Sequence, residues 1–170
     1  MRVGAYIIAR RYSYHQLGIV AQERGDLAAA ERWYRQSLEI KEALGDRPGL
    51  ASSYHQLGMV AQDRGDLAAA ERWYRQSLEI SEALCNRPVL ALTYAQLGLL
   101  SEARGDPAAA LDWTVRCVAL LPDIPNPQTE PGPGRLVALA ASLGVPALEA
   151  SWQRCTGAAL PAHIRAAAAP

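Results

Sequence analysis

The chain has 170 residues, half of them apolar, and its 17 basic and 17 acidic residues cancel to a formal net charge of zero. This length and apolar content allow a folded domain with a sizeable core, which excludes a disordered chain. The balanced charge offers no attraction for nucleic acid or an anionic membrane, and no apolar stretch approaches the roughly 20 residues of a membrane-spanning helix, so we expect neither partner.

The opening residues and the cysteines indicate a reducing compartment. The start, MRVGAYIIARR, has an apolar stretch at residues 3–9 but no small-residue cleavage site after it, which disfavours a signal peptide. Cys85, Cys117 and Cys155 are odd in number and far apart, unlike a disulfide framework or a metal site. Lys41 is the only lysine among many arginines, and Phe is absent, as expected of a GC-rich genome. We therefore predict a cytoplasmic, bacterial protein.

Three stretches of the sequence repeat with a period of 40 residues, each marked by Arg-Gly-Asp at residues 24–26, 64–66 and 104–106. The first two copies, residues 13–44 and 53–84, differ only at Ile19/Met59, Glu23/Asp63 and Lys41/Ser81. The third copy, residues 93–121, diverges further, as terminal repeats do. A period in this range predicts stacked supersecondary units.

Each copy predicts two helices joined by a tight turn. Apolar and small residues recur three, four and seven positions apart, which is helical periodicity. In the third copy the turn reads Gly105-Asp106-Pro107, and Pro suits a first helical position, preceded by an Asp cap and a helix-ending Gly. Asp26 and Asp66 are expected to cap in the same way. The predicted pairs are 3–24 with 27–44, 48–64 with 67–84, and 88–104 with 107–121.

The C-terminal quarter is predicted to be organised differently. Residues 122–134, PDIPNPQTEPGPG, hold five prolines and two glycines and are expected to form a linker. Residues 135–144 and 146–157 predict a shorter helix pair, and the sequence after it predicts either a capping helix or a frayed tail. The predicted domains are thus 1–121, the linker 122–134 and a C-terminal segment 135–170.

The repeat resembles the tetratricopeptide repeat, in its long 40-residue form, similar to Pins/LGN adaptors, kinesin light chains and bacterial arrays. The resemblance rests on an aromatic residue, a Leu-Gly pair, a small residue and a small-to-aromatic step in the second helix, here Tyr14, Leu17, Gly18, Ala21, Ala30, Tyr34 and Ser37, with the same residue types 40 positions later. It implies an all-α fold, a right-handed α-solenoid of antiparallel helix pairs. Gly18 and Ala30 are expected to allow close helix approach, and Tyr14 and Tyr34 to fill the gap between neighbouring pairs. In the third copy Thr114 replaces the second aromatic residue.

The resemblance also implies a concave groove lined by the first helix of each pair. The side chains expected to point into it are Tyr12, His15, Gln16, Ile19, Gln22, Ser52, His55, Gln56, Met59, Gln62, Gln96, Leu99 and Glu102. Among these, the glutamines just before Leu-Gly stand where long-repeat relatives usually carry an Asn that holds the backbone of a bound peptide, and Gln offers the same donor and acceptor. The alternative is that they are only solvated groove residues.

Two further groups of groove residues have competing interpretations. Ile19, Met59 and Leu99 form an apolar stripe that suits an apolar side chain of a peptide or helix, or else belongs to the core between repeats. His15 and His55 recur one repeat apart, but neighbouring helices lie about 8–10 Å apart and no Cys or carboxylate joins them at ligand spacing. We expect hydrogen-bonding histidines and no metal.

The sequence contains no phosphate-binding loop, zinc-protease helix motif or nucleophile elbow, so we expect neither an enzyme nor a cofactor. We predict a protein–protein interaction scaffold that binds a peptide or partner helix in the concave groove. The alternative is a regulatory or oligomerisation segment of a larger bacterial signalling protein, NTPase-linked or transcriptional, which would form a homodimer. Arg-Gly-Asp is an integrin signal on exposed loops of secreted proteins, whereas here it is expected to form a turn between helices.

Overall fold

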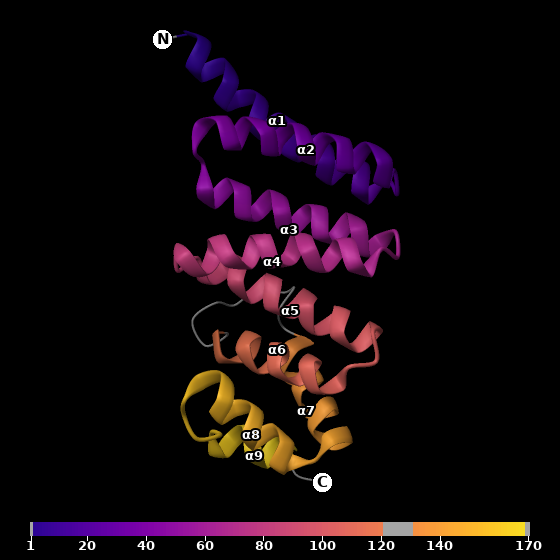
Figure 1. Ribbon diagram of the computed structural model, residues 1–170, viewed down its shortest axis with the longest axis vertical. Coiled ribbons are helices and arrows are strands. Elements are labelled where there is room, and N and C mark those ends of the chain that lie inside the picture. Colours follow the sequence, from indigo (N-terminus) through magenta and orange to yellow (C-terminus); the bar gives the residue numbers. More distant parts are fainter. Residues whose placement is uncertain (1, 121–130, 169–170) are drawn as a thin grey trace. The chain divides into compact units, whose positions relative to one another are not determined.

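The computed structural model describes residues 2–120 and 131–168, and side-chain surroundings for residues 12–120 and 132–168. Every regular element in these ranges is an α-helix, so the predicted all-α class is confirmed. Two compact units divide the chain at residues 89 and 90. The first unit holds α1 (Arg2–Glu23), α2 (Leu27–Leu44), α3 (Arg47–Asp63) and α4 (Leu67–Ala83), which form two helix pairs (Figure 1).

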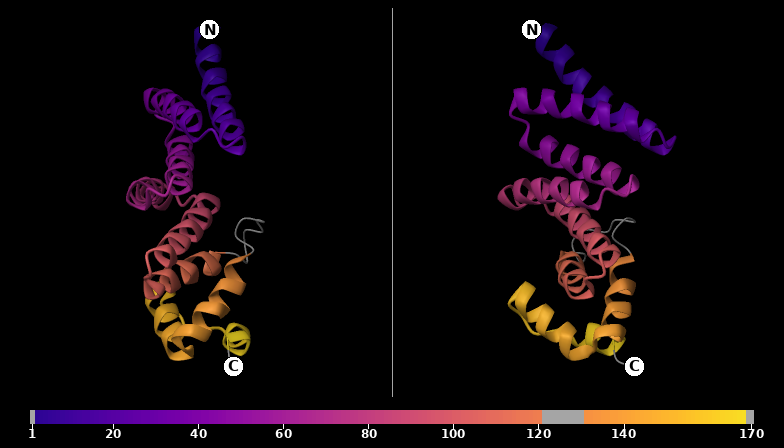
Figure 2. Two further views of the ribbon diagram at one scale, coloured as in Figure 1. Left: turned by 90° about the vertical axis from the view of Figure 1, so that its right-hand side faces the viewer. Right: turned by 45° about the vertical axis from the view of Figure 1, so that its right-hand side comes forward.

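The helix boundaries agree with the predicted ones to within one or two residues up to residue 120. Beyond α4 the helices are α5 (Arg87–Ala103), α6 (Pro107–Leu120), α7 (Pro131–Leu143), α8 (Val145–Thr156) and α9 (Ala162–Ala168). Figure 2 shows the helices from two further directions. Residues 121–130, most of the predicted linker, lie outside the described residues.

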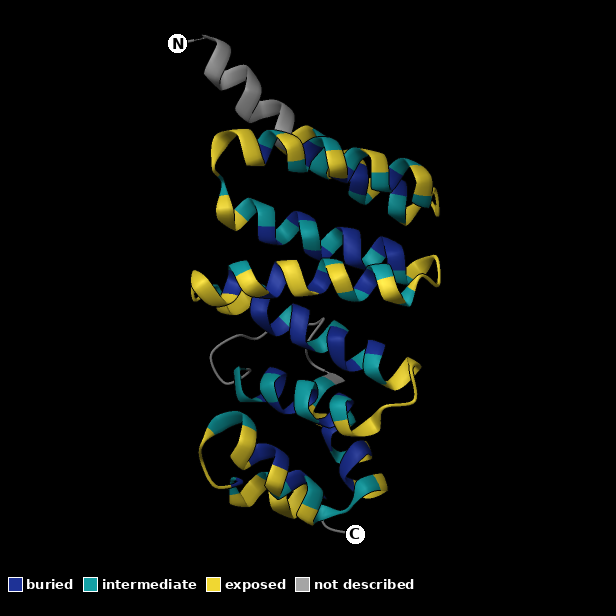
Figure 3. Ribbon diagram, in the orientation of Figure 1, coloured by how far each residue is buried: buried dark blue, intermediate teal, exposed yellow. Residues whose placement is uncertain are grey.

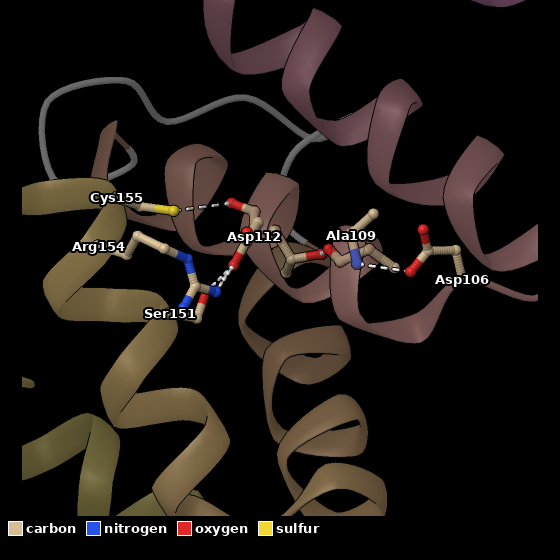
Figure 4. Close-up of polar contacts among 8 residues, drawn as sticks. Asp106, Ala109, Asp112, Ser151, Arg154 and Cys155 are labelled. Atoms are coloured by element: carbon tan, nitrogen blue, oxygen red, sulfur yellow. Dashed lines mark hydrogen bonds and ion pairs between the residues drawn. The ribbon is translucent and has the colours of Figure 1, made fainter.

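The Arg-Gly-Asp tripeptides form the turns within each helix pair. Gly25 has a φ of 75°, a left-handed conformation that glycine adopts without steric cost. Asp26 then accepts a hydrogen bond from the backbone N–H of Ala29 at 2.9 Å, which satisfies one of the unpaired donors at the start of α2. Asp66 and Asp106 cap α4 and α6 with the same geometry, the latter visible in Figure 4. The predicted capping role is confirmed.

The connection between pairs uses a left-handed residue as well. Gly45 ends α2 with a φ of 65°, and the counterpart after α4 is Cys85, whose φ is 50°. Cys85 is the only non-glycine residue of the described backbone with a positive φ. Asp46 then caps α3 through the N–H of Gly49 at 3.1 Å.

A tyrosine ring and a glycine determine how closely the two helices of a pair approach. The ring of Tyr34, fully buried, lies over Gly18, where an added Cβ would come within 2.4 Å of the ring. Tyr14 stacks on Trp33 of the same pair, with ring centroids 5.5 Å apart. The expectation that Tyr14 and Tyr34 fill the gap between neighbouring pairs is confirmed for Tyr34, whose ring also belongs to a buried cluster with Leu57 and Val60 of the next pair. For Tyr14 the observed ring contact is within its own pair.

The two pairs of the first unit join through α2 and α3. Leu57 and Val60 of α3 lie in one buried cluster with Ala30 and Tyr34 of α2. Two polar contacts flank this cluster. Gln22 donates a hydrogen bond to Asp63 at 2.9 Å, and Arg64 forms an ion pair with Glu31. The contact between repeats is thus an apolar centre with charged and polar edges.

The second unit continues the repeat in α5 and α6 and then departs from it. Tyr94 stacks on Trp113, as in the earlier pairs, while α7, α8 and α9 share an apolar core with α6 that includes Leu136, Leu148 and Trp152. Asp112 of α6 accepts hydrogen bonds from Ser151 at 2.5 Å and from Arg154 at 2.6 Å on α8 (Figure 4).

The structure corrects one expectation about this C-terminal part and decides between the alternatives of another. Helix α7 begins at Pro131, four residues before the predicted start, because Pro131 and Pro133 occupy its first turn, where proline loses no helical hydrogen bond. The residues after 157 were predicted as either a capping helix or a frayed tail. They contain a short helix, α9, whose Ala168 is buried in the core of this unit.

Candidate functional site

The residues predicted to line a groove lie on the first helix of each pair. Within the first unit, α1 carries Tyr12, His15, Gln16, Ile19 and Gln22, and α3 carries Ser52, His55, Gln56, Met59 and Gln62. Gln96, Leu99 and Glu102 lie on α5 of the second unit. The structure divides these side chains into a buried group, a hydrogen-bonded group and a free group.

The two histidines are packed against the buried tyrosines. The rings of His15 and Tyr34 have centroids 5.5 Å apart, and His55 and Tyr74 repeat this distance. Burial lowers the pKa of His55 to about 4, and burial together with the nearby Lys41 ammonium lowers the pKa of His15 to about 4. Both imidazoles are therefore neutral at pH 7. His55 is buried, so its ring is not accessible to a ligand.

Gln22 and Gln62 act as braces between helices. The Tyr34 hydroxyl donates to Gln22 Oε1 at 3.1 Å, and the Tyr74 hydroxyl donates to Gln62 Oε1 at 3.0 Å. Burial raises the pKa of both tyrosines, so each hydroxyl keeps its proton for this bond. Because Gln22 also bonds Asp63, it fixes α1 to both α2 and α3. These amides are committed to internal hydrogen bonds.

Gln16 and Gln56 differ from the braced glutamines. Gln16 is exposed and Gln56 half-buried, and neither side chain makes a hydrogen bond within the described part of the chain. On α5, Gln96 is half-buried and likewise makes no hydrogen bond to any described residue. An amide that is accessible and unpaired can donate to and accept from the backbone of a bound peptide.

The remaining groove residues have mixed environments. Ile19, Met59 and Leu99 are half-buried, and Ile19 packs against the cluster between α2 and α3. The apolar stripe is thus partly core and partly surface. Tyr12 is exposed, Ser52 donates to the backbone carbonyl of Pro48 at 3.3 Å, and Glu102 pairs with Arg135 at 3.0 Å.

Lys41 is a residue that the sequence reasoning missed. Its ammonium is buried and donates to Ser53 Oγ at 2.7 Å, at the edge of a cavity of about 290 Å³ that Tyr12, His15 and Ser52 also line. The signal in the sequence was the single lysine at a position where the second copy has Ser81. Among the described residues no group of three or more His, Cys, Asp or Glu side chains is placed to hold a metal ion.

Comparison with known proteins places this geometry in a family. The family model of the tetratricopeptide repeat matches residues 9–83 and 49–123, more than half of the chain. The chain belongs to the tetratricopeptide repeat family. Tetratricopeptide repeats generally mediate protein–protein interactions and typically form non-catalytic scaffolds.

One solved structure with a similar fold is that of BtubC (BKLC) from P. vanneervenii. The two share 23% sequence identity with a TM-score of 0.69, over 92% of this chain and 63% of the BtubC chain. The chain therefore spans less than two thirds of the length of that relative. This likeness bears out the α-solenoid fold. No curated protein matches the chain. None of the described helices has both the length and the apolar character to cross a bilayer.

Proposed function

We propose that this tetratricopeptide protein is an interaction scaffold that binds a peptide or a partner helix along the first helices of its repeats, with unpaired glutamine amides holding the ligand backbone. The observation that carries the proposal is the state of the amides on α1 and α3. The side chains of Gln22 and Gln62 form hydrogen bonds within the chain. The side chains of Gln16 and Gln56, six residues earlier on the same helices, form none with the described residues.

The repeat supports this assignment in a second way. Gln16, Gln56 and Gln96 are each 40 residues apart, although the third copy has lost His and the second-helix aromatic residue at other positions. Half-buried Met59 lies one turn of α3 beyond Gln56 and offers an adaptable apolar contact beside the amide. An amide to hold a ligand backbone and an apolar neighbour to take its side chain are what an extended or helical peptide needs.

The cellular setting is part of the proposal. Cys85 is exposed, Cys155 is half-buried and Cys117 is buried, and all three are free thiols. Burial raises the pKa of the Cys117 thiol to about 11, so it is unreactive. Free thiols with one exposed member suit a reducing cytoplasm.

The test is selection of ligands on the full chain from a displayed library of random peptides, followed by affinity measurement with variants. The double variant Gln16→Ala/Gln56→Ala is expected to weaken selected peptides by about tenfold or more, because two hydrogen bonds worth about 1 kcal/mol each are lost. The matched control Gln76→Ala/Gln153→Ala removes two exposed amides from α4 and α8 and should leave affinity unchanged. Equal affinities for both variants, with unchanged circular dichroism, would refute the glutamine contact.

A further inference from the structure

The outward face of α1 is exposed, although its residues are the same as those of a buried face on α3. Leu17 is 43% exposed and Val20 is 39% exposed, whereas their counterparts Leu57 and Val60 are 2% and 1% exposed. Figure 3 shows buried and intermediate positions along most of α3. Residue type does not explain this difference in exposure, because positions 17 and 57 are both Leu and positions 20 and 60 are both Val.

The difference is confined to one side of α1. The side that faces α2 is as buried as its counterpart on α3, since Gly18, Ala21, Gly58 and Ala61 are all buried. Gly18 and Gly58 also lie against Tyr34 and Tyr74 in the same way. Among the residues whose side chains the structure describes, α1 is thus packed against α2 as α3 is against α4, and it has no neighbour on the side that corresponds to the α2-facing side of α3.

The chain itself shows which chemistry covers such a face. On α3, Leu57 and Val60 pack in a cluster that includes Ala30 and Trp33 of α2, and Arg64 pairs with Glu31. On α1, Arg24 is the counterpart of Arg64, and it forms no ion pair or hydrogen bond through its side chain with any described residue. The exposed face therefore combines two apolar side chains with an unpaired guanidinium in the arrangement that α3 presents to α2.

We propose that the face formed by Leu17, Val20 and Arg24 is a docking site for a helix of a partner protein with the surface chemistry of α2. Such a helix presents a small residue next to a carboxylate, followed by aromatic residues two and three positions after the carboxylate, as in Ala30, Glu31, Trp33 and Tyr34. The carboxylate pairs with Arg24, and the small residue and the aromatic ring cover Leu17 and Val20.

A partner helix fits this face better than a second copy of the chain. In a second copy the matching surface of α2 is already covered by its own α3, through the Glu31–Arg64 pair and the cluster around Leu57. If the α1 faces of two copies met, the Arg24 guanidinium of each would lie against the same face of the other copy. Neither face would supply the carboxylate that Glu31 of α2 provides to Arg64. The charge and shape of the face therefore select a helix that carries Glu at the Glu31 position.

The experiment uses the sequence of α2 itself as the probe. A synthetic peptide of residues 26–45, which includes the Asp26 cap, is titrated into the ¹⁵N-labelled full chain, with NMR shifts as readout. We expect saturable shifts centred on Leu17, Val20 and Arg24. Leu17→Asp should weaken the peptide by about tenfold or more, because it places a charge in the centre of an apolar contact. The matched control is Leu44→Asp, at a residue 42% exposed on α2, and it should leave the affinity unchanged.

A charge exchange distinguishes binding of the peptide at this face from displacement of α2 by the peptide in the contact between α2 and α3. Arg24→Glu should weaken the wild-type peptide, and a peptide with Glu31→Arg should restore binding to that variant. Peptide affinity that is unchanged by both Leu17→Asp and Arg24→Glu would overturn the proposal. The absence of saturable NMR shifts up to the solubility limit of the peptide would also overturn it. A homodimer of the free chain that dissociates on Leu17→Asp would also overturn it, because the occupant would then be a second copy.

Discussion

The first and second repeats have almost the same sequence and yet occupy different environments. They differ at three positions between residues 13–44 and 53–84, and none of those substitutions lies at Leu17 or Val20. What differs is the neighbour, since α3 is packed against α2 whereas the corresponding side of α1 is exposed. The comparison shows that in a repeat fold the burial of a residue is set by the stacked units as much as by its own repeat.

Equivalent polar residues of the first and second repeats also differ in burial. Ser53 is buried and receives a hydrogen bond from Lys41, whereas its counterpart Ser13 is exposed. His55 is buried, whereas His15 is half-buried and its Nδ1 has no hydrogen-bond partner in the described structure. Identical side chains therefore provide matched pairs in which only the environment changes.

The largest effect is expected for truncation of the leucine pair. Leu57→Ala should lower the free energy of unfolding by about 2–5 kcal/mol, because it leaves a cavity between α2 and α3. Leu17→Ala should change it by less than about 1 kcal/mol, because Leu17 is already 43% exposed and its truncation leaves no enclosed cavity. Urea unfolding followed by circular dichroism measures both. Equal losses for the two variants would show that the face of α1 is covered in solution.

The next effect is a pH dependence that comes from both histidines, less from the half-buried His15, which solvent screens, than from the buried His55. Its pKa of about 4 in the folded chain lies below the ordinary value of about 6.5, so between these values the unfolded chain binds more protons. The free energy of unfolding should therefore fall as pH is lowered from about 6.5 to 4, by up to about 3 kcal/mol for a fully buried ring, and then level off. His55→Gln should flatten this dependence more than His15→Gln, in urea titrations at several pH values. An NMR titration that gives His55 an ordinary pKa would contradict this.

A glycine pair extends the comparison to the third repeat. An added Cβ at Gly58 would lie 2.5 Å from the Tyr74 ring, whereas at Gly98 its nearest contact is Thr114 Oγ1 at 3.2 Å. Gly58→Ala should therefore cost about 1–3 kcal/mol through overpacking. Gly98→Ala should be neutral within about 1 kcal/mol, since the gain in helix propensity offsets a tight contact. Thermal unfolding of the two variants checks this, and a large loss at Gly98 would show that Thr114 cannot move.

The smallest effect is expected at the connections between pairs. Cys85 and Gly45 occupy equivalent positions with positive φ, which costs a residue with a side chain roughly 1–2 kcal/mol. Cys85→Gly should therefore stabilise the chain by up to about 1 kcal/mol, part of the relief being lost to the entropy of the unfolded glycine. Gly45→Cys should destabilise it by a similar amount. A loss of stability in Cys85→Gly would mean that the thiol makes a favourable contact in solution.

The helices and turns could be predicted from the sequence because their signals are local. Asp26, Gly25 and Pro107 specify a turn and a cap without reference to distant residues, and the structure has them in those roles. The start of α7 was predicted four residues late because the Pro-rich run around Pro131 has the composition of a linker, although proline is compatible with a first helical turn.

The candidate site was less predictable because it depends on contacts between helices. The sequence places Gln16 and Gln22 together in a groove, but it cannot show that the Tyr34 hydroxyl takes one of them and leaves the other free. His15 and His55 occupy equivalent positions in the sequence repeat, and the sequence cannot show that only His55 is buried. The identity of the partner and the alternative of a signalling segment stay predictions, because neither follows from the packing of one chain.

The difference in exposure between Leu17 and Leu57 is tested most directly by the rate of thiol labelling at these two positions. Leu17→Cys and Leu57→Cys are each made in a background of Cys85→Ser, which removes the exposed native thiol. Under native conditions we expect the thiol at residue 17 to react at least about a hundredfold faster than the thiol at residue 57, because the latter is reached only through local or global opening. Equal protection of both thiols would contradict it, since the outward face of α1 would then be covered in the free chain.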